Sequence, residues 1–135
     1  MISNPEFGWC DFELRTFEGH PSYLTDVPVD LLDAFIDYFT EGMGMAWFNE
    51  EGTEFTLVIN PYSLYIIEEK GESTLHDFSE MKVEKLAKEL IDDIEKDLTA
   101  WSMFFVYDDQ EEIEMNRNNI RQRIAKLKKI LNYKL

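Results

Sequence analysis

Hydrophobic and polar residues alternate over the run WCDFELRTF at 9–17. In an extended chain, successive side chains point to opposite faces, so one face of this run is apolar and the other is charged. The pattern predicts a half-buried strand over 9–17, followed by a turn in the Gly-His-Pro-Ser run at 19–22. The side chains expected on the buried face are Cys10, Phe12, Leu14 and Thr16.

The period changes to that of a helix in the next segment. Pro28 suits the first turn of a helix, and the carboxylate of Asp30 suits its positive end. We therefore predict a helix over about 28–40, which Gly42 and Gly44 end. Its apolar stripe consists of Leu31, Leu32, Phe35, Ile36 and Phe39.

Three short apolar runs follow, over 45–48, 53–59 and 63–68. A glycine-bearing loop at 49–52 separates the first two, and an Asn-Pro turn at 60–61 separates the second from the third. Strands joined by such short turns pair antiparallel. The sequence predicts a three-stranded meander, to which the N-terminal strand is added to give a sheet of four strands.

Two helical patterns fill the rest of the chain, with apolar residues at spacings of three and four. The first runs from about Ser79 to Trp101, and the second runs from near Asp109 to the C-terminus. Asp109 and Glu112 are spaced like a capping pair at the start of the second helix. We predict that the two helices form an antiparallel hairpin that turns near 103–109.

These elements place the chain in the α+β class. Their order is β-α-β-β-β-α-α, with a four-stranded, mostly antiparallel sheet packed by helices and a C-terminal helical hairpin. No internal repeat, low-complexity run or flexible linker divides the sequence. We expect a single acidic domain over 1–135, because this length is near the usual size of one domain and an apolar fraction of 44% supplies a core.

Charge is distributed unevenly along the chain, whose formal net charge is −15. Residues 1–116 hold 28 acids and six bases, a balance of −22, whereas residues 117–135 hold seven bases and no acid. An acidic surface disfavours direct binding to nucleic acid or to an anionic membrane, and it attracts a basic protein. In the predicted hairpin, acids of the first helix face bases of the second, namely Asp92, Asp93, Arg117 and Arg121.

Cysteine content and the lengths of the apolar runs bear on the compartment. Cys10 is the only cysteine, so no intramolecular disulfide can form, and a reducing compartment is the simpler interpretation. The N-terminus lacks the basic start and apolar run of a signal peptide, and no apolar run is long enough to span a bilayer. We expect a cytoplasmic protein that does not enter a membrane.

Residue types that carry catalysis are sparse. His20 lies in a turn, and His76 has Asp77 beside it and Glu80 four residues on, without an identifiable third metal ligand. Cys10 falls on the predicted inner face, where thiols are usually inert. The sequence contains no phosphate-binding glycine loop, nucleophile elbow or paired cysteine motif. We predict no catalytic residue, no metal site and no cofactor.

Acids also repeat at one-turn spacing along the first of the two C-terminal helices, at Glu89, Asp93 and Asp97. A row of this kind resembles a line of phosphates. Bases of the same helix stand four residues from neighbouring acids, however, which is the usual pattern of a solvent-exposed helix. We favour the exposed helix over a mimic of nucleic acid.

The segment WSMFFVY at 101–107 concentrates aromatic and apolar side chains immediately before an acidic run. Aromatic clusters ringed by charge are favoured at protein interfaces. The alternative is that these residues close the core beneath the helical hairpin. One helix cannot bury all of them in a single direction, so the candidate partner-binding residues are Trp101, Phe104, Phe105, Tyr107, Asp108, Asp109, Glu111 and Glu112.

These patterns favour a non-enzymatic acidic binding protein that neutralises or inhibits a basic protein partner, in the manner of an immunity protein or an inhibitor. Complementary charge speeds the encounter, and buried rings hold the complex. The alternative is a self-associating structural or regulatory module, which forms a homodimer through its C-terminal helices. A small hydrolase is the least favoured class, since no catalytic signature supports one.

Overall fold

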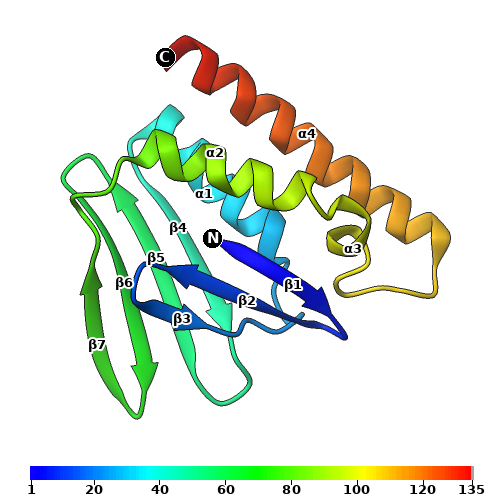
Figure 1. Cartoon of the computed structure of the whole chain (residues 1–135), viewed down its shortest axis with the longest axis horizontal. Coiled ribbons are helices and arrows are strands. Elements are labelled where there is room, and N and C mark those ends of the chain that lie inside the picture. The colour runs from blue at the N-terminus through cyan, green and yellow to red at the C-terminus, as the bar shows by residue number, and fades with distance from the viewer. Residues whose placement is uncertain (135) are drawn as a thin grey trace.

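The computed structural model describes residues 1–134, whose arrangement is shown in Figure 1. Within these residues, two antiparallel sheets and four helices form a mixed α+β fold, which confirms the predicted class. The elements in chain order are β1 (Ile2–Glu6), β2 (Trp9–Leu14), β3 (Phe17–Gly19), α1 (Val27–Glu41), β4 (Gly44–Asn49), β5 (Glu54–Asn60), β6 (Ser63–Lys70), β7 (Glu72–Asp77), α2 (Val83–Glu95), α3 (Leu98–Ser102) and α4 (Gln110–Lys134).

The N-terminal sheet has the strand order β1-β2-β3 and corrects the prediction of one strand over 9–17. The chain reverses at Arg15, whose φ is 53°, so that Leu14 pairs with Phe17. Paired residues point to the same face of a sheet, so Phe17 is buried, whereas Thr16, which was predicted inside, is exposed. The predicted buried positions that the structure confirms are Cys10, Phe12 and Leu14.

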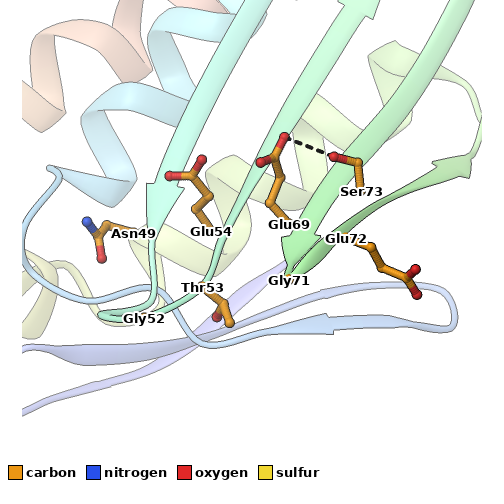
Figure 2. A pocket seen from close by; sticks show the side chains of 8 residues that line it. All are labelled: Asn49, Gly52, Thr53, Glu54, Glu69, Gly71, Glu72 and Ser73. Atoms are coloured by element: carbon orange, nitrogen blue, oxygen red, sulfur yellow. Dashed lines mark hydrogen bonds between the residues drawn. The ribbon is translucent and has the colours of Figure 1, made fainter.

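A four-stranded antiparallel sheet is present, with the order β4-β5-β6-β7, but its fourth strand is not the predicted one. β4, β5 and β6 form the predicted meander, and β7 follows a turn at Gly71, whose φ is 79°. β7 is mostly polar and exposed, so no hydrophobic alternation reveals it in the sequence. The turns at Gly52 and Gly71 lie at the same end of the sheet, around a shallow polar concavity (Figure 2).

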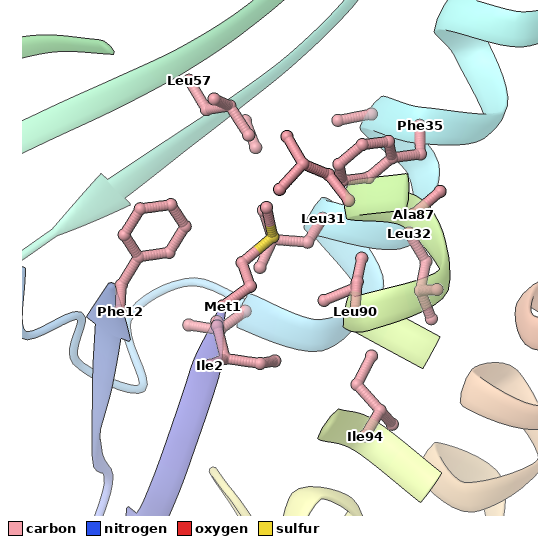
Figure 3. Close-up of a cluster of buried hydrophobic side chains, with 14 of the residues drawn as sticks. Met1, Ile2, Phe12, Leu31, Leu32, Phe35, Leu57, Ala87, Leu90 and Ile94 are labelled. Carbon is pink, nitrogen blue, oxygen red and sulfur yellow. The ribbon is translucent and has the colours of Figure 1, made fainter. Parts of the chain in front are cut away.

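The core lies between the two sheets and the helices, and all four helices contribute buried side chains to it. The ring centroids of Phe12 and Phe17 are each 5.1 Å from that of Phe55, which joins the sheets through aromatic contacts. A Cβ on Gly19 would come within 2.5 Å of the Phe55 ring, so glycine is required at this contact. Figure 3 shows the adjoining part of the core, where Met1 lies among side chains of α1, β5 and α2.

Helix α1 confirms the predicted segment and ends at Gly42, whose φ is 90° and whose N–H donates to the carbonyl of Tyr38. Just beyond it, Gly44 begins β4. A Cβ on Gly44 would lie 1.7 Å from the carbonyl oxygen of Ala34, so β4 passes directly against the backbone of α1. Among the described residues, no helix combines the length and apolarity that crossing a bilayer requires.

The C-terminal helices differ from the prediction in continuity and in packing. The helix predicted over 79–101 is broken at Asp97, whose φ is −142°, and this break separates α2 from the short α3. The long α4 returns in the direction opposite to α2, with α3 in the turn (Figure 1). It packs chiefly along α1, where Arg123 donates to Asp33 at 2.9 Å.

The acidic stripe of α2 has a partner inside the fold. The N-terminal ammonium of Met1 donates to Asp93 at 2.6 Å and to Glu89 at 3.1 Å. Arg117 pairs with Glu114 on its own helix. The predicted pairing of this part of α2 with Arg117 is therefore not formed, and the stripe instead fixes the start of β1.

Candidate protein-binding site

A groove of about 770 Å³ is lined by the tip of the β1–β2 hairpin and by the segment that follows α3. Figure 1 shows these two parts of the backbone. The walls of the groove come from three parts of the chain that are distant in sequence, and most of the lining is aromatic or apolar. We call it the aromatic groove. It is lined by Pro5, Glu6, Phe7, Gly8, Tyr23, Ala100, Met103, Phe104, Phe105 and Tyr107.

The hairpin tip presents Phe7 to solvent in an unusual backbone conformation. Glu6 pairs with Trp9, so Phe7 and Gly8 form a two-residue turn with φ values of 55° and 78°. Turns of this type favour asparagine or glycine at the first position, and a bulky side chain at positive φ is strained. The Phe7 side chain is 90% exposed, so its ring adds almost nothing to the core in return.

Tyr23 forms the wall next to this turn. Its N–H donates to the carbonyl of Gly8 at 2.8 Å. A Cβ on Gly8 would lie 2.9 Å from Cδ1 of Tyr23, so the ring lies directly on the glycine. The preceding residue, Ser22, forms a bridge with Trp9, which attaches this segment to the N-terminal sheet.

The opposite wall is anchored by buried residues of α3. Trp101 is 1% exposed, and its ring centroid is 5.6 Å from that of Phe104, which is also buried. Asn116 of α4 donates to the carbonyl of Ser102 at 3.2 Å, which fixes the end of α3. These contacts hold the start of the segment 103–107 in place, and exposure rises along it from the buried Phe104 to the exposed Tyr107.

The predicted partner-binding residues divide between core and surface. Trp101 lies in the core, and Phe104 forms the floor of the groove. Phe105 is half-buried in its wall, and Tyr107 is 75% exposed. The acids behind them lie outside the core: Asp108, Asp109 and Glu111 are exposed, and Glu112 is partly exposed.

Asp109 also has a structural role that the sequence predicts correctly. Its Oδ1 accepts a hydrogen bond of 3.1 Å from the N–H of Glu112, so it caps the first turn of α4. The groove residues that were not among the predicted ones are Pro5, Glu6, Phe7, Gly8, Tyr23, Ala100 and Met103. The one local signal among them is the glycine of the Phe7-Gly8 pair, which indicates a turn but does not indicate a binding surface.

The charged residues in the groove lining and in the segment directly after Tyr107 are acidic. Glu6 is the one charged residue in its lining, and no Lys or Arg of the described chain lines it. We call Glu6, together with the exposed Asp108, Asp109 and Glu111 that follow the lining residue Tyr107 in the sequence, the acidic rim. Three cations of α4 pair with acids outside this set: Arg117 with Glu114, Arg123 with Asp33, and Lys128 with Glu95 at 3.0 Å.

The remaining polar candidates have ordinary structural surroundings. His20 contacts Asp11 at 3.0 Å, and His76 contacts Glu68 at 3.1 Å. Cys10 is buried, and this burial raises the pKa of its thiol. Within residues 1–134, no group of three or more His, Cys, Asp or Glu side chains is arranged to hold a metal ion.

No family model matches this chain, and no curated protein or solved structure matches it. What the chain binds is therefore inferred from its own surface.

Proposed function

We propose that this chain is an acidic binding protein, which uses the aromatic groove and the acidic rim to hold and inhibit a basic protein partner. The observation that carries the proposal is an apolar groove lined by the exposed, strained Phe7 and by the exposed Tyr107, in which the one charged lining residue of the described chain is the acid Glu6. Strain that the core does not require is a recognised mark of functional sites.

Charge and aromatic contact contribute different parts of this binding. The balance of −22 over 28 acids and six bases in residues 1–116 steers a cationic protein toward the surface and raises the association rate. Rings such as Phe7 and Tyr107 then supply the desolvated contact that slows dissociation. Removing one such ring typically costs about 2 kcal/mol of binding free energy, or roughly thirtyfold in Kd.

The alternative function is self-association through the C-terminal helices, but α4 offers little free apolar surface for it. The apolar stripe of α4 is already buried in the chain's own core, at Ile113, Ile120, Ile124, Leu127 and Leu131. Met115 is an exposed apolar residue on this helix, and one isolated side chain does not make a dimer interface.

The proposal is tested by affinity capture from the native cell with three immobilised forms of the chain. The first is the wild type, and the second carries Phe7→Asn and Tyr107→Ser in the groove. The third is a matched control with Tyr62→Ser, because Tyr62 is 93% exposed but lies outside the groove lining. We expect the wild type and the control to retain a basic protein that the groove variant loses.

Titration of the purified partner completes the test. We expect Kd to rise at least tenfold in the groove variant and the association rate to fall steeply between low and physiological salt. A captured protein that binds the groove variant as tightly as the wild type contradicts the proposal. So does an acidic partner, or an association rate that salt does not change.

A further inference from the structure

A second surface, separate from the aromatic groove, lies on the outer face of the four-stranded sheet. Strand register places its side chains in three rows across β4 to β7. The first two rows are mostly apolar or aromatic, and the third is polar and acidic. The rows are Met45-Val58-Tyr65-Asp77, Trp47-Thr56-Ile67-Leu75 and Asn49-Glu54-Glu69-Ser73.

Most side chains of the apolar rows remain open to solvent, whereas Val58 between Met45 and Tyr65 is buried, at 4% exposure. Met45, Trp47 and Leu75 are 59%, 43% and 62% exposed, and Tyr65 and Ile67 between them are partly exposed. The helices lie on the other face, where Leu57 meets side chains of α1 (Figure 3). An antiparallel sheet with one solvated face normally carries polar residues on that face. Neighbouring exposed apolar residues of this kind mark an interaction surface.

The third row gives this face a negative end. Glu54 and Glu69 point to the same side from neighbouring strands (Figure 2). With Glu72, they line a concavity of about 390 Å³ between the two hairpin turns, and no base of the described chain lines it. Indole Nε1 of Trp47 donates to Glu54 at 2.9 Å, so the apolar and acidic parts form one continuous surface.

The nearby base, Lys70, forms its ion pair on the opposite face of the sheet. Lys70 contacts Glu68 at 3.3 Å, and Glu68 also binds His76, which lies against the ring of Phe17 in the core. The carboxylates of Glu54 and Glu69 have hydrogen-bond donors as neighbours, such as the hydroxyl of Ser73 on Glu69. No cation is among the described side chains that line their concavity.

We propose that this outer face is a docking surface for a cationic amphipathic segment of a partner protein. Apolar side chains of the segment lie on the rows of Met45 and Trp47, and its lysines or arginines meet Glu54 and Glu69. Charge complementarity selects this occupant over a second copy of the chain. A second copy brings the same carboxylates and a net charge of −15 to the interface.

This surface stands on residues different from those of the aromatic groove, so each proposal can fail without the other. The probe is a synthetic amphipathic peptide of leucine and lysine, compared with peptides in which glutamine or glutamate replaces every lysine. Binding is measured by calorimetry, and its location is mapped from amide shifts in the NMR spectrum of the full chain. We expect the lysine peptide to bind, with shifts centred on β4 to β7.

Three variants show which surface binds the peptide. Trp47→Thr with Leu75→Thr removes the apolar rows while keeping residues that suit strands, and we expect Kd to rise about tenfold or more. Glu54→Gln with Glu69→Gln keeps the shape of the face, and we expect weaker binding of the lysine peptide with less dependence on salt. Phe7→Asn, in the groove, leaves this binding unchanged.

Several outcomes overturn the proposal. One is equal affinity for the lysine and glutamine peptides, and another is unchanged binding after loss of Trp47 and Leu75. Loss of binding in Phe7→Asn alone places the peptide in the groove, which supports the proposed function and refutes this second surface. Shifts on β4 to β7 that appear on concentrating the free chain identify a second copy as the occupant. Circular dichroism of each variant confirms that the fold is retained, and the glutamine pair keeps the test valid if the threonine pair unfolds.

Discussion

Replacing Phe7 with asparagine should make the fold more stable while it weakens partner binding. Phe7 has a φ of 55°, and a left-handed conformation costs a residue with a bulky side chain roughly 1–2 kcal/mol. Asparagine tolerates this conformation and is favoured at the first position of such a turn. The substitution therefore removes most of that cost.

Removing the ring of Phe7 sacrifices little burial energy, because the residue is 90% exposed. Full burial of a phenylalanine stabilises a fold by about 2–3 kcal/mol, so the buried tenth of this ring contributes only about 0.3 kcal/mol. We expect a net gain of about 1 kcal/mol in the free energy of unfolding. With a urea m-value of about 2 kcal/mol/M, the midpoint of urea unfolding rises by roughly 0.5 M.

The assay is urea unfolding of the wild type and of the variants Phe7→Asn and Phe7→Tyr. The tyrosine variant keeps both a ring and the strain, so its midpoint stays at the wild-type value and it still binds the partner. A fall in the midpoint of Phe7→Asn shows that the ring supports the core, and that result refutes the interpretation of Phe7 as a binding residue held under strain.

Three further predictions concern charge and packing. Burial lowers the pKa of the N-terminal ammonium, but the hydrogen bonds and charges of Asp93 and Glu89 outweigh it and raise that pKa above 8.0. The stability that this group contributes is therefore complete below pH 8 and is lost as the pH rises through the raised pKa. Asp93→Asn should reduce this loss, which is measured from the midpoints of urea unfolding across that pH range. Burial, with the charges of Asp26 and Asp33, raises the pKa of Asp30 to about 6, so the folded state loses stability as the pH rises from about 4 to 6. Asp30→Asn should therefore raise the free energy of unfolding by up to about 1 kcal/mol at pH 7 and leave it unchanged at pH 3.5. Gly44→Ala places a methyl group against the carbonyl of Ala34 and should cost about 3 kcal/mol or more in thermal unfolding, whereas an unchanged Tm contradicts the close contact of α1 with β4.

Local patterns predicted the elements whose ends are marked by local chemistry. Helix α1 was predicted to within about a residue because Pro28 favours its first turn and Gly42 adopts the left-handed conformation that ends it. The meander of β4 to β6 was predicted because its turns carry glycine, asparagine and proline. The cap of α4 by Asp109 follows from spacing alone.

Where local pattern and tertiary packing diverge, the predictions were wrong. The alternation over 9–17 continues through the turn at Arg15, so the sequence shows one strand where the chain makes two. The apolar stripe of α4 fits any apolar neighbour, and its choice of α1 over α2 depends on three-dimensional packing.

The candidate site was half predictable for the same reason. Phe105 and Tyr107 belong to a conspicuous aromatic run, so the sequence selected them as candidates, and both line the groove. Phe7 and Tyr23 reach the groove only because the β1–β2 hairpin folds against the segment after α3. No spacing in the sequence connects residues that are so far apart along the chain.

Because the chain has a single thiol, the alkylation of that thiol reports on local opening of the fold. Cys10 lies in the central strand of the N-terminal sheet, is buried, and donates to the carbonyl of Pro21 at 3.7 Å. An alkylating reagent can reach it only when that sheet separates from the aromatic core. The rate at which the reagent's mass is added therefore measures how often the hairpin that carries Phe7 detaches from the rest of the molecule.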